Sequence, residues 1–74
     1  MVKFTFTNIT LWAKMNGFQV GESFDALELF EGDYDPSGLP TESDDLPCVV
    51  FRRPSNGDLY ILSNCNEEGV LSCS

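Results

Sequence analysis

The sequence predicts an α+β fold, a small single-layer antiparallel sheet of three to five strands with one or two short helices packed on one face. Residues 2–7 alternate apolar and polar side chains, which is the period-two pattern of a half-buried strand. Two runs rich in β-branched and aromatic residues, 48–53 and 58–63, flank the turn sequence Pro54-Ser55-Asn56-Gly57. Asn-Gly supplies the positive φ angles of a tight turn, so these runs predict a C-terminal β-hairpin.

The remaining elements follow from capping and turn residues. Asn8 stands at a helix N-cap position, and residues 9–15 can form two helical turns that end at Asn16-Gly17, with Leu11, Trp12 and Met15 on one face. Residues 23–30 are open to two interpretations, and a helix capped by Ser23 is favoured over a strand. Residues 64–69 predict a turn, and 70–73 a short last strand.

The chain of 74 residues predicts a single compact domain, residues 1–74. A domain of this size has one small core and a net stability of about a few kcal/mol. Phe51 and Ile61 are expected in the core of the hairpin. Cys48 lies in an apolar run and is expected to be buried, whereas Cys65 and Cys73 leave open whether a hairpin brings them together in a disulfide.

The residue inventory argues against an enzyme. The chain has no histidine, so it lacks a Ser-His or Cys-His pair and the usual proton shuttle at neutral pH. It contains neither a GxGxxG nor a Walker sequence, and we expect no cofactor and no metal centre. Twelve acidic residues against four basic ones argue against direct binding of nucleic acid, and Arg52 and Arg53 are expected to pair with nearby carboxylates. With neither a signal peptide nor an apolar run of about 20 residues, we expect a cytoplasmic protein without a membrane span.

The most distinctive feature is an acidic block between Lys14 and Arg52, which contains nine of the twelve carboxylates and no basic residue. On a helix, the carboxylates from Glu22 to Glu31 would recur every third residue and form a ridge. In the long loop predicted for residues 31–45, Glu31, Asp33 and Asp35 would project to one side about 6.8 Å apart, twice the strand rise of ~3.4 Å. Aromatic and apolar residues are interleaved with these acids: Phe24, Leu27, Phe30, Tyr34 and Leu39.

This combination predicts a surface that binds a basic protein, because carboxylates steer a basic partner and aromatic side chains supply desolvated anchors. A nucleic-acid-binding effector or a nuclease offers such a basic surface, and the chain would then act as an inhibitor or nucleic-acid mimic. In size, charge and lack of catalytic groups it is similar to small phage-encoded anti-CRISPR, anti-restriction and glycosylase-inhibitor proteins. The predicted partner-binding residues are Glu22, Asp25, Glu28, Glu31, Asp33, Tyr34, Asp35, Glu42, Asp44 and Asp45.

Two other functions stay open. One is a small structural or assembly protein, including a homodimer, that associates through a sheet edge. The other is weak calcium binding, because the segment from Asp33 to Gly38 has the spacing D-x-D-x-S-G with Asp44 at the twelfth position, which resembles an EF-hand loop. Pro40 at the eighth position and the absence of an exiting helix depart from that pattern.

Overall fold

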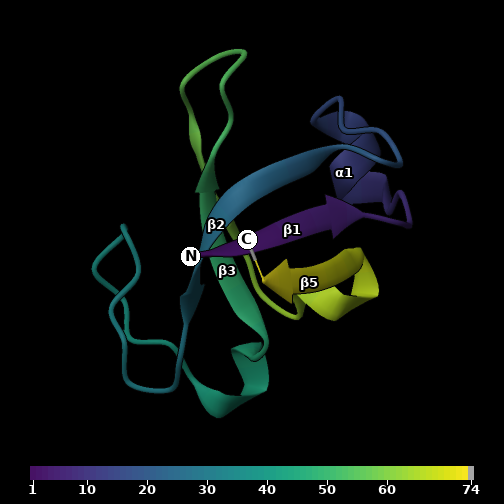
Figure 1. Ribbon diagram of the computed structural model, residues 1–74. Helices are drawn as coiled ribbons and strands as arrows, with labels where there is room; N and C mark the ends of the chain where they lie inside the picture. Colours follow the sequence, from purple (N-terminus) through teal and green to yellow (C-terminus); the bar gives the residue numbers. More distant parts are fainter. Residues whose placement is uncertain (74) are drawn as a thin grey trace.

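The computed structural model describes residues 1–73, and these form one five-stranded sheet in the order β4-β3-β2-β1-β5 (Figure 1). All four strand pairs are antiparallel, so the predicted antiparallel sheet is confirmed. The C-terminal hairpin is confirmed in part, because its strands pair as expected but only Gly57 of the Asn-Gly turn has a positive φ, 74°. The strands are β1 Val2–Phe6, β2 Ser23–Leu29, β3 Cys48–Arg52, β4 Leu59–Leu62 and β5 Gly69–Cys73; the helices are α1 Leu11–Met15 and the 3₁₀ turns η1 Ser43–Asp45 and η2 Cys65–Glu67. Helix is the minor component of this α+β fold.

The helix favoured for residues 23–30 is wrong, because this segment is β2, the central strand of the sheet. It pairs with β1 on one side and with β3 on the other, so its backbone is satisfied by neighbours distant in sequence. Phe24 and Ala26 alternate with exposed residues and enter the core. The Ser23 hydroxyl hydrogen-bonds across the sheet to Thr5 Oγ1 at 2.8 Å and caps no helix. Tertiary pairing here overrides a local capping preference.

The main core lies on one face of the sheet and is largely aromatic. Phe24 of β2 stacks on Phe51 of β3 with centroids 4.6 Å apart, and Phe6 of β1 stacks on Phe18 at the same distance. Phe4 and Phe6 are fully buried, as is Ala13 of α1. Offset-stacked and edge-to-face rings each add to the stabilisation from area burial alone. The five phenylalanines therefore join three strands to the segment that follows α1.

Helix α1 is shorter than predicted and begins later. Thr10, rather than Asn8, is the N-cap, and its Oγ1 accepts a hydrogen bond from the Ala13 amide at 3.2 Å. Leu11 and Met15 are 75% and 78% exposed, so they do not enter the core, and the helix contacts the core through Ala13 and Trp12. A five-residue helix of this kind is held by its cap and by these contacts rather than by propensity.

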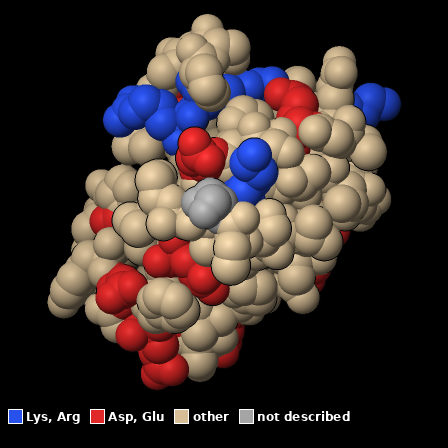
Figure 2. Space-filling view, viewed as in Figure 1, with Lys and Arg blue, Asp and Glu red and all other residues tan. Residues whose placement is uncertain are grey.

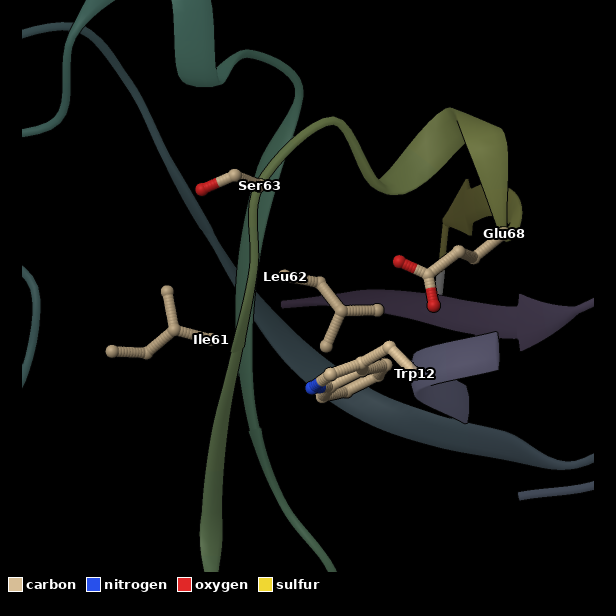
Figure 3. A pocket seen from close by; sticks show the side chains of 5 residues that line it. All are labelled: Trp12, Ile61, Leu62, Ser63 and Glu68. Carbon is tan, nitrogen blue, oxygen red and sulfur yellow. The ribbon is translucent and has the colours of Figure 1, made fainter. Parts of the chain in front are cut away.

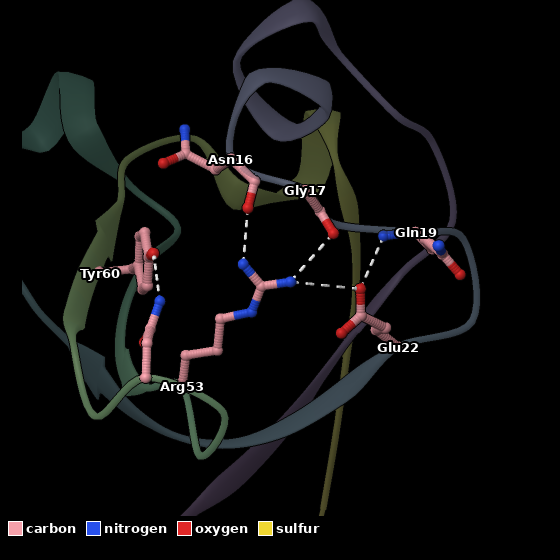
Figure 4. Close-up of polar contacts among 7 residues, drawn as sticks. Asn16, Gly17, Gln19, Glu22, Arg53 and Tyr60 are labelled. Atoms are coloured by element: carbon pink, nitrogen blue, oxygen red, sulfur yellow. Dashed lines mark hydrogen bonds and ion pairs between the residues drawn. The ribbon is translucent and has the colours of Figure 1, made fainter.

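Arg53, just after β3, ties the hairpin to the segment between α1 and β2 (Figure 4). Its guanidinium donates hydrogen bonds to the carbonyls of Asn16 and Gly17, at 2.5 and 2.9 Å, and lies 4.1 Å from the centroid of the Phe18 ring. Glu22 Oε1 lies 3.8 Å from Nη2 and also accepts a hydrogen bond from the Gln19 amide. The planar guanidinium thus meets two carbonyls, one carboxylate and one aromatic face at once.

The opposite face of the sheet is mostly open. A small cluster of Leu29, Cys48 and Val50 is buried there against Leu46 and Ile61.

Burial raises the pKa of the Cys48 thiol and raises that of Cys65, which lies in the main core, to about 11. All three cysteines are free thiols, so the bond considered between Cys65 and Cys73 is not formed. Among the described residues, no helix has the length and apolarity to span a bilayer.

Phe51→Ala tests the aromatic core. Phe51 is 2% exposed and contacts several rings, so we expect a loss of about 3–5 kcal/mol in the free energy of unfolding, enough to unfold a domain of this size. Ile61 is half-buried against the smaller cluster, so Ile61→Ala should leave the domain folded but weakened. Circular dichroism during urea denaturation measures the unfolding free energy of both variants. Equal losses of unfolding free energy would contradict the assignment of Phe51 to the main core.

Arg53→Ala tests the link between hairpin and helix. The substitution removes two hydrogen bonds to carbonyls and a cation–π contact, and we expect a loss of about 2 kcal/mol in unfolding free energy. Arg52→Ala is the matched control, because it removes the same charge from an exposed position that bonds only the Gly57 carbonyl of its own turn. Similar urea midpoints for the two variants would contradict the role assigned to Arg53.

Candidate partner-binding surface

Residues 30–47 connect β2 to β3, and we call residues 30–45 of this surface connection the acidic loop. It carries six carboxylates and no lysine or arginine, a formal charge of −6 against −8 for the whole chain. Acidic side chains gather at the end of the molecule where this loop lies in Figure 1, and basic side chains gather toward the other end (Figure 2). On this face of the molecule, the carboxylates at the end of the loop therefore lie apart from most of the lysine and arginine side chains.

The acidic loop is folded back on itself. Its two arms exchange backbone hydrogen bonds from Gly32 N to Thr41 O at 2.9 Å, from Thr41 N to Asp33 O at 2.7 Å and from Asp35 N to Leu39 O at 2.9 Å. Tyr34 and Pro40 form an isolated antiparallel bridge, and Gly38, with a φ of 83°, makes the turn at the tip. Thr41 is 5% exposed. The predicted long loop thus has the internal pairing of a small, irregular hairpin.

Three of the six carboxylates hold this conformation. Asp33 Oδ2 accepts a hydrogen bond from the Phe30 amide at 2.8 Å, and Asp45 Oδ2 accepts one from the Glu42 amide at 3.1 Å. Asp35 Oδ1 accepts two, from the amides of Ser37 and Leu39 at 2.8 and 3.1 Å. Since Asp33 and Asp35 turn back to the backbone, the predicted row of evenly spaced carboxylates from Glu31 to Asp35 is wrong.

The outer surface of the loop combines exposed acids with exposed apolar side chains. Glu31, Glu42 and Asp44 are exposed. Phe30, Tyr34 and Leu39 are 59%, 72% and 62% exposed, so the loop presents three large apolar side chains among its acids. Phe30 and Leu39 were missing from the predicted site, although their alternation with the acids was the signal that could have included them.

Both ends of the loop are fixed to the sheet. Leu29 and Cys48 pair across β2 and β3 and are buried, and Leu46 packs against them. At the second end, the Asn64 amide donates to Asp45 O at 2.8 Å and the Asn64 side chain donates to Asp44 O at 3.0 Å. The loop therefore projects from a rigid base.

The predicted ridge of carboxylates from Glu22 to Glu31 is wrong, because β2 sends its acids to different places. Glu22 pairs with Arg53, far from the acidic loop in the fold. Asp25 pairs in register with Lys3 and lines a hollow of about 340 Å³ that Arg52 also lines, so it has basic neighbours. Glu28 is half-buried on the sheet face that carries Ala26. These three predicted site residues therefore lie outside the acidic loop, which contains the other seven.

The calcium-like spacing does not produce a cluster of ligands. Asp33 and Asp35 accept backbone hydrogen bonds within the loop, and Pro40 pairs with Tyr34. Within residues 1–73, no group of three or more acidic or cysteine side chains is arranged to hold a metal ion.

Asp35 substitutions test whether carboxylates order the loop. Asp35→Ala removes the acceptor for two amides, so we expect faster hydrogen exchange at Ser37 and Leu39 and a loss of about 1 kcal/mol in unfolding free energy. Asp35→Asn keeps an acceptor oxygen and should exchange like the unsubstituted protein. Glu31→Ala, which removes an exposed acid without a side-chain hydrogen bond in the described structure, is the control. Rapid exchange in Asp35→Asn as well would show that the charge, and not the hydrogen bonds, orders the tip.

Comparisons of the chain with protein-family models, with curated proteins and with solved structures give no match.

Proposed function

We propose that this protein is a small non-enzymatic inhibitor that uses the acidic loop to bind the basic surface of a nucleic-acid-handling protein, in place of nucleic acid. The observation that carries the proposal is the presence of Phe30, Tyr34 and Leu39, all more than half exposed, on a hydrogen-bonded loop of charge −6. Exposed apolar side chains among uncompensated acids are costly for a free protein and useful for a bound one.

The charge of the loop suits a lysine- and arginine-rich partner. Carboxylates of one sign raise the rate of encounter with a basic surface over about a Debye length, ~8–10 Å. Apolar anchors at the centre of the contact then slow dissociation, because most binding energy comes from a few desolvated side chains. The same field repels phosphate, so a protein that holds nucleic acid is a better partner than nucleic acid itself.

The internal bonding of the loop favours binding further. Association costs free energy for every segment that must be ordered in the complex. Asp33, Asp35 and Asp45 already hold the backbone in one conformation, which leaves the exposed Glu31 and Asp44 available to a partner. The acids of the loop thus divide between maintaining its shape and presenting charge.

A charge-reversal pair tests the proposal. Proteins captured from a bacterial lysate by the immobilised domain are identified, and the affinity of each purified candidate is measured with and without competing duplex DNA. The double variant Glu31→Lys with Asp44→Lys should weaken binding at least about tenfold, since two attractive contacts become repulsive. Tyr34→Ala should weaken it by a similar factor through loss of an anchor. Binding should also weaken steeply between about 0.05 and 0.5 M salt as the charges are screened.

The matched control reverses two acids outside the loop and away from Glu68, Asp58→Lys with Asp25→Lys. Both are exposed, and the change in net charge is identical. This control should retain binding within about threefold. Equal losses in the two double variants would mean that only net charge matters. The nucleic-acid-mimic proposal would be overturned if the affinity of the complex did not fall with salt concentration, or if duplex DNA did not compete for the partner.

A second candidate function is self-association or assembly through a sheet edge. Strands β4 and β5 are the two edges, and Leu59 and Val70 on them are 47% and 55% exposed. Light scattering distinguishes this candidate: a stable dimer dissociated by Val70→Lys or Leu59→Lys, and indifferent to the acidic-loop substitutions, would favour assembly.

A further inference from the structure

A separate hollow of about 230 Å³ lies between α1, the edge strand β4 and the turn after η2. Trp12, Ile61, Leu62, Ser63 and Glu68 line it. Figure 3 shows the Glu68 carboxylate, the Leu62 side chain and the Trp12 indole facing a common space beside β4. None of these residues belongs to the acidic loop, and the hollow combines a negative group, an aromatic ring and an apolar wall.

Glu68 is the charged group of this hollow. It is half-buried, and Thr10 Oγ1 donates a hydrogen bond to its Oε2 at 3.2 Å. Its Oε1 accepts no hydrogen bond from the part of the chain that the structure describes. Burial raises the pKa of this carboxyl, the hydrogen bond from Thr10 opposes that shift, and the neighbouring Glu67 adds to it. A cation placed against Oε1 would compensate for the water that the carboxylate has lost.

Trp12 supplies an aromatic surface beside this carboxylate. Its indole stacks on the Phe18 ring, with centroids 5.7 Å apart and an interplanar angle of 27°, and meets Tyr60 edge-on. With these contacts made, the residue is still 38% exposed. Tryptophan is the aromatic side chain with the strongest attraction for a cation over its face.

The wall of the hollow suits an aliphatic chain. Leu62 is 2% exposed and forms part of the main core, so it makes a small fixed floor, and most of the apolar surface comes from Trp12 and the half-buried Ile61. An aliphatic stem can lie along such a wall with its charged end against Glu68, as long basic side chains do on apolar surfaces.

We propose that this hollow binds a primary alkylammonium group, specifically the lysine side chain of a partner protein. Lysine fits better than arginine because a bidentate guanidinium would have to share Oε2 with the Thr10 hydroxyl, whereas an ammonium needs a single acceptor and can use Oε1 alone. The choice of a protein lysine rather than a free amine rests on the proposed function, in which the partner is basic.

The test uses Trp12, the only tryptophan of the chain, as its probe. N-acetyl-lysine methylamide is titrated into the intact domain at constant ionic strength, while tryptophan fluorescence and the NMR signals of Trp12 and Glu68 are recorded. We expect a saturable response in the millimolar range, a response at least about threefold weaker for the arginine analogue, and none for the Nε-acetylated lysine analogue, which lacks the charge.

Glu68→Gln and Glu67→Gln form a matched pair of variants. Both remove one negative charge, and glutamine at 68 keeps an oxygen for the Thr10 hydroxyl, so both are expected to fold. Glu68→Gln should weaken the lysine response at least about tenfold, in keeping with loss of a charge-assisted hydrogen bond, and Glu67→Gln should leave it within about twofold. Equal effects of the two substitutions, binding of the acetylated analogue, or no saturation with lysine would each overturn the inference.

This titration uses no partner protein, so its failure leaves capture by the acidic loop intact. Conversely, the double variant Glu31→Lys with Asp44→Lys should lose the captured partner and keep the Trp12 response. With a captured partner in hand, Glu68→Gln should weaken the complex more than Glu67→Gln does. Equal affinities would overturn the assignment of a partner lysine to the hollow.

Discussion

Strand β2 lies at the centre of the sheet, between β1 and β3, and the paths of the other segments follow from that position. Its backbone is paired on both sides, and its Phe24 stacks on Phe51, so the strand joins the N-terminal and C-terminal halves of the chain. At the β5 edge, β5 approaches β1 so closely at Gly69 that a Cβ there would lie 2.0 Å from Thr5 O. With β2 in place, the acidic loop must leave the sheet at Leu29 and return at Cys48, which fixes its base.

The position of β2 also sorts the acidic residues into groups with different roles. Three acids of the single negative block in the sequence have different surroundings in the fold. Glu22 pairs with Arg53, Asp25 lies near basic residues, and Glu28 is half-buried. Within the loop, some carboxylates accept backbone hydrogen bonds and others face solvent. Charge that looks uniform along the chain is therefore concentrated at one end of the molecule.

The two proposed sites complement one another in their physics. The acidic loop offers long-range attraction and several apolar anchors, which suits a broad basic surface. The hollow at Glu68 offers one half-buried carboxylate beside an indole, which suits a single ammonium. One partner that carries both a basic surface and a projecting lysine would satisfy both.

Local sequence patterns were enough to predict the antiparallel sheet, the pairing of residues 48–52 with 59–62, the burial of Cys48 and Phe51, and the acidic character of residues 31–45, because alternation and charge are local properties. Only the tertiary structure decided that residues 23–30 form a strand, since their capping residues favour a helix and the pairing with β1 and β3 outweighs that preference. It also decided which carboxylates stay free and brought Trp12 beside Glu68, because contacts between residues far apart in the sequence leave no local pattern.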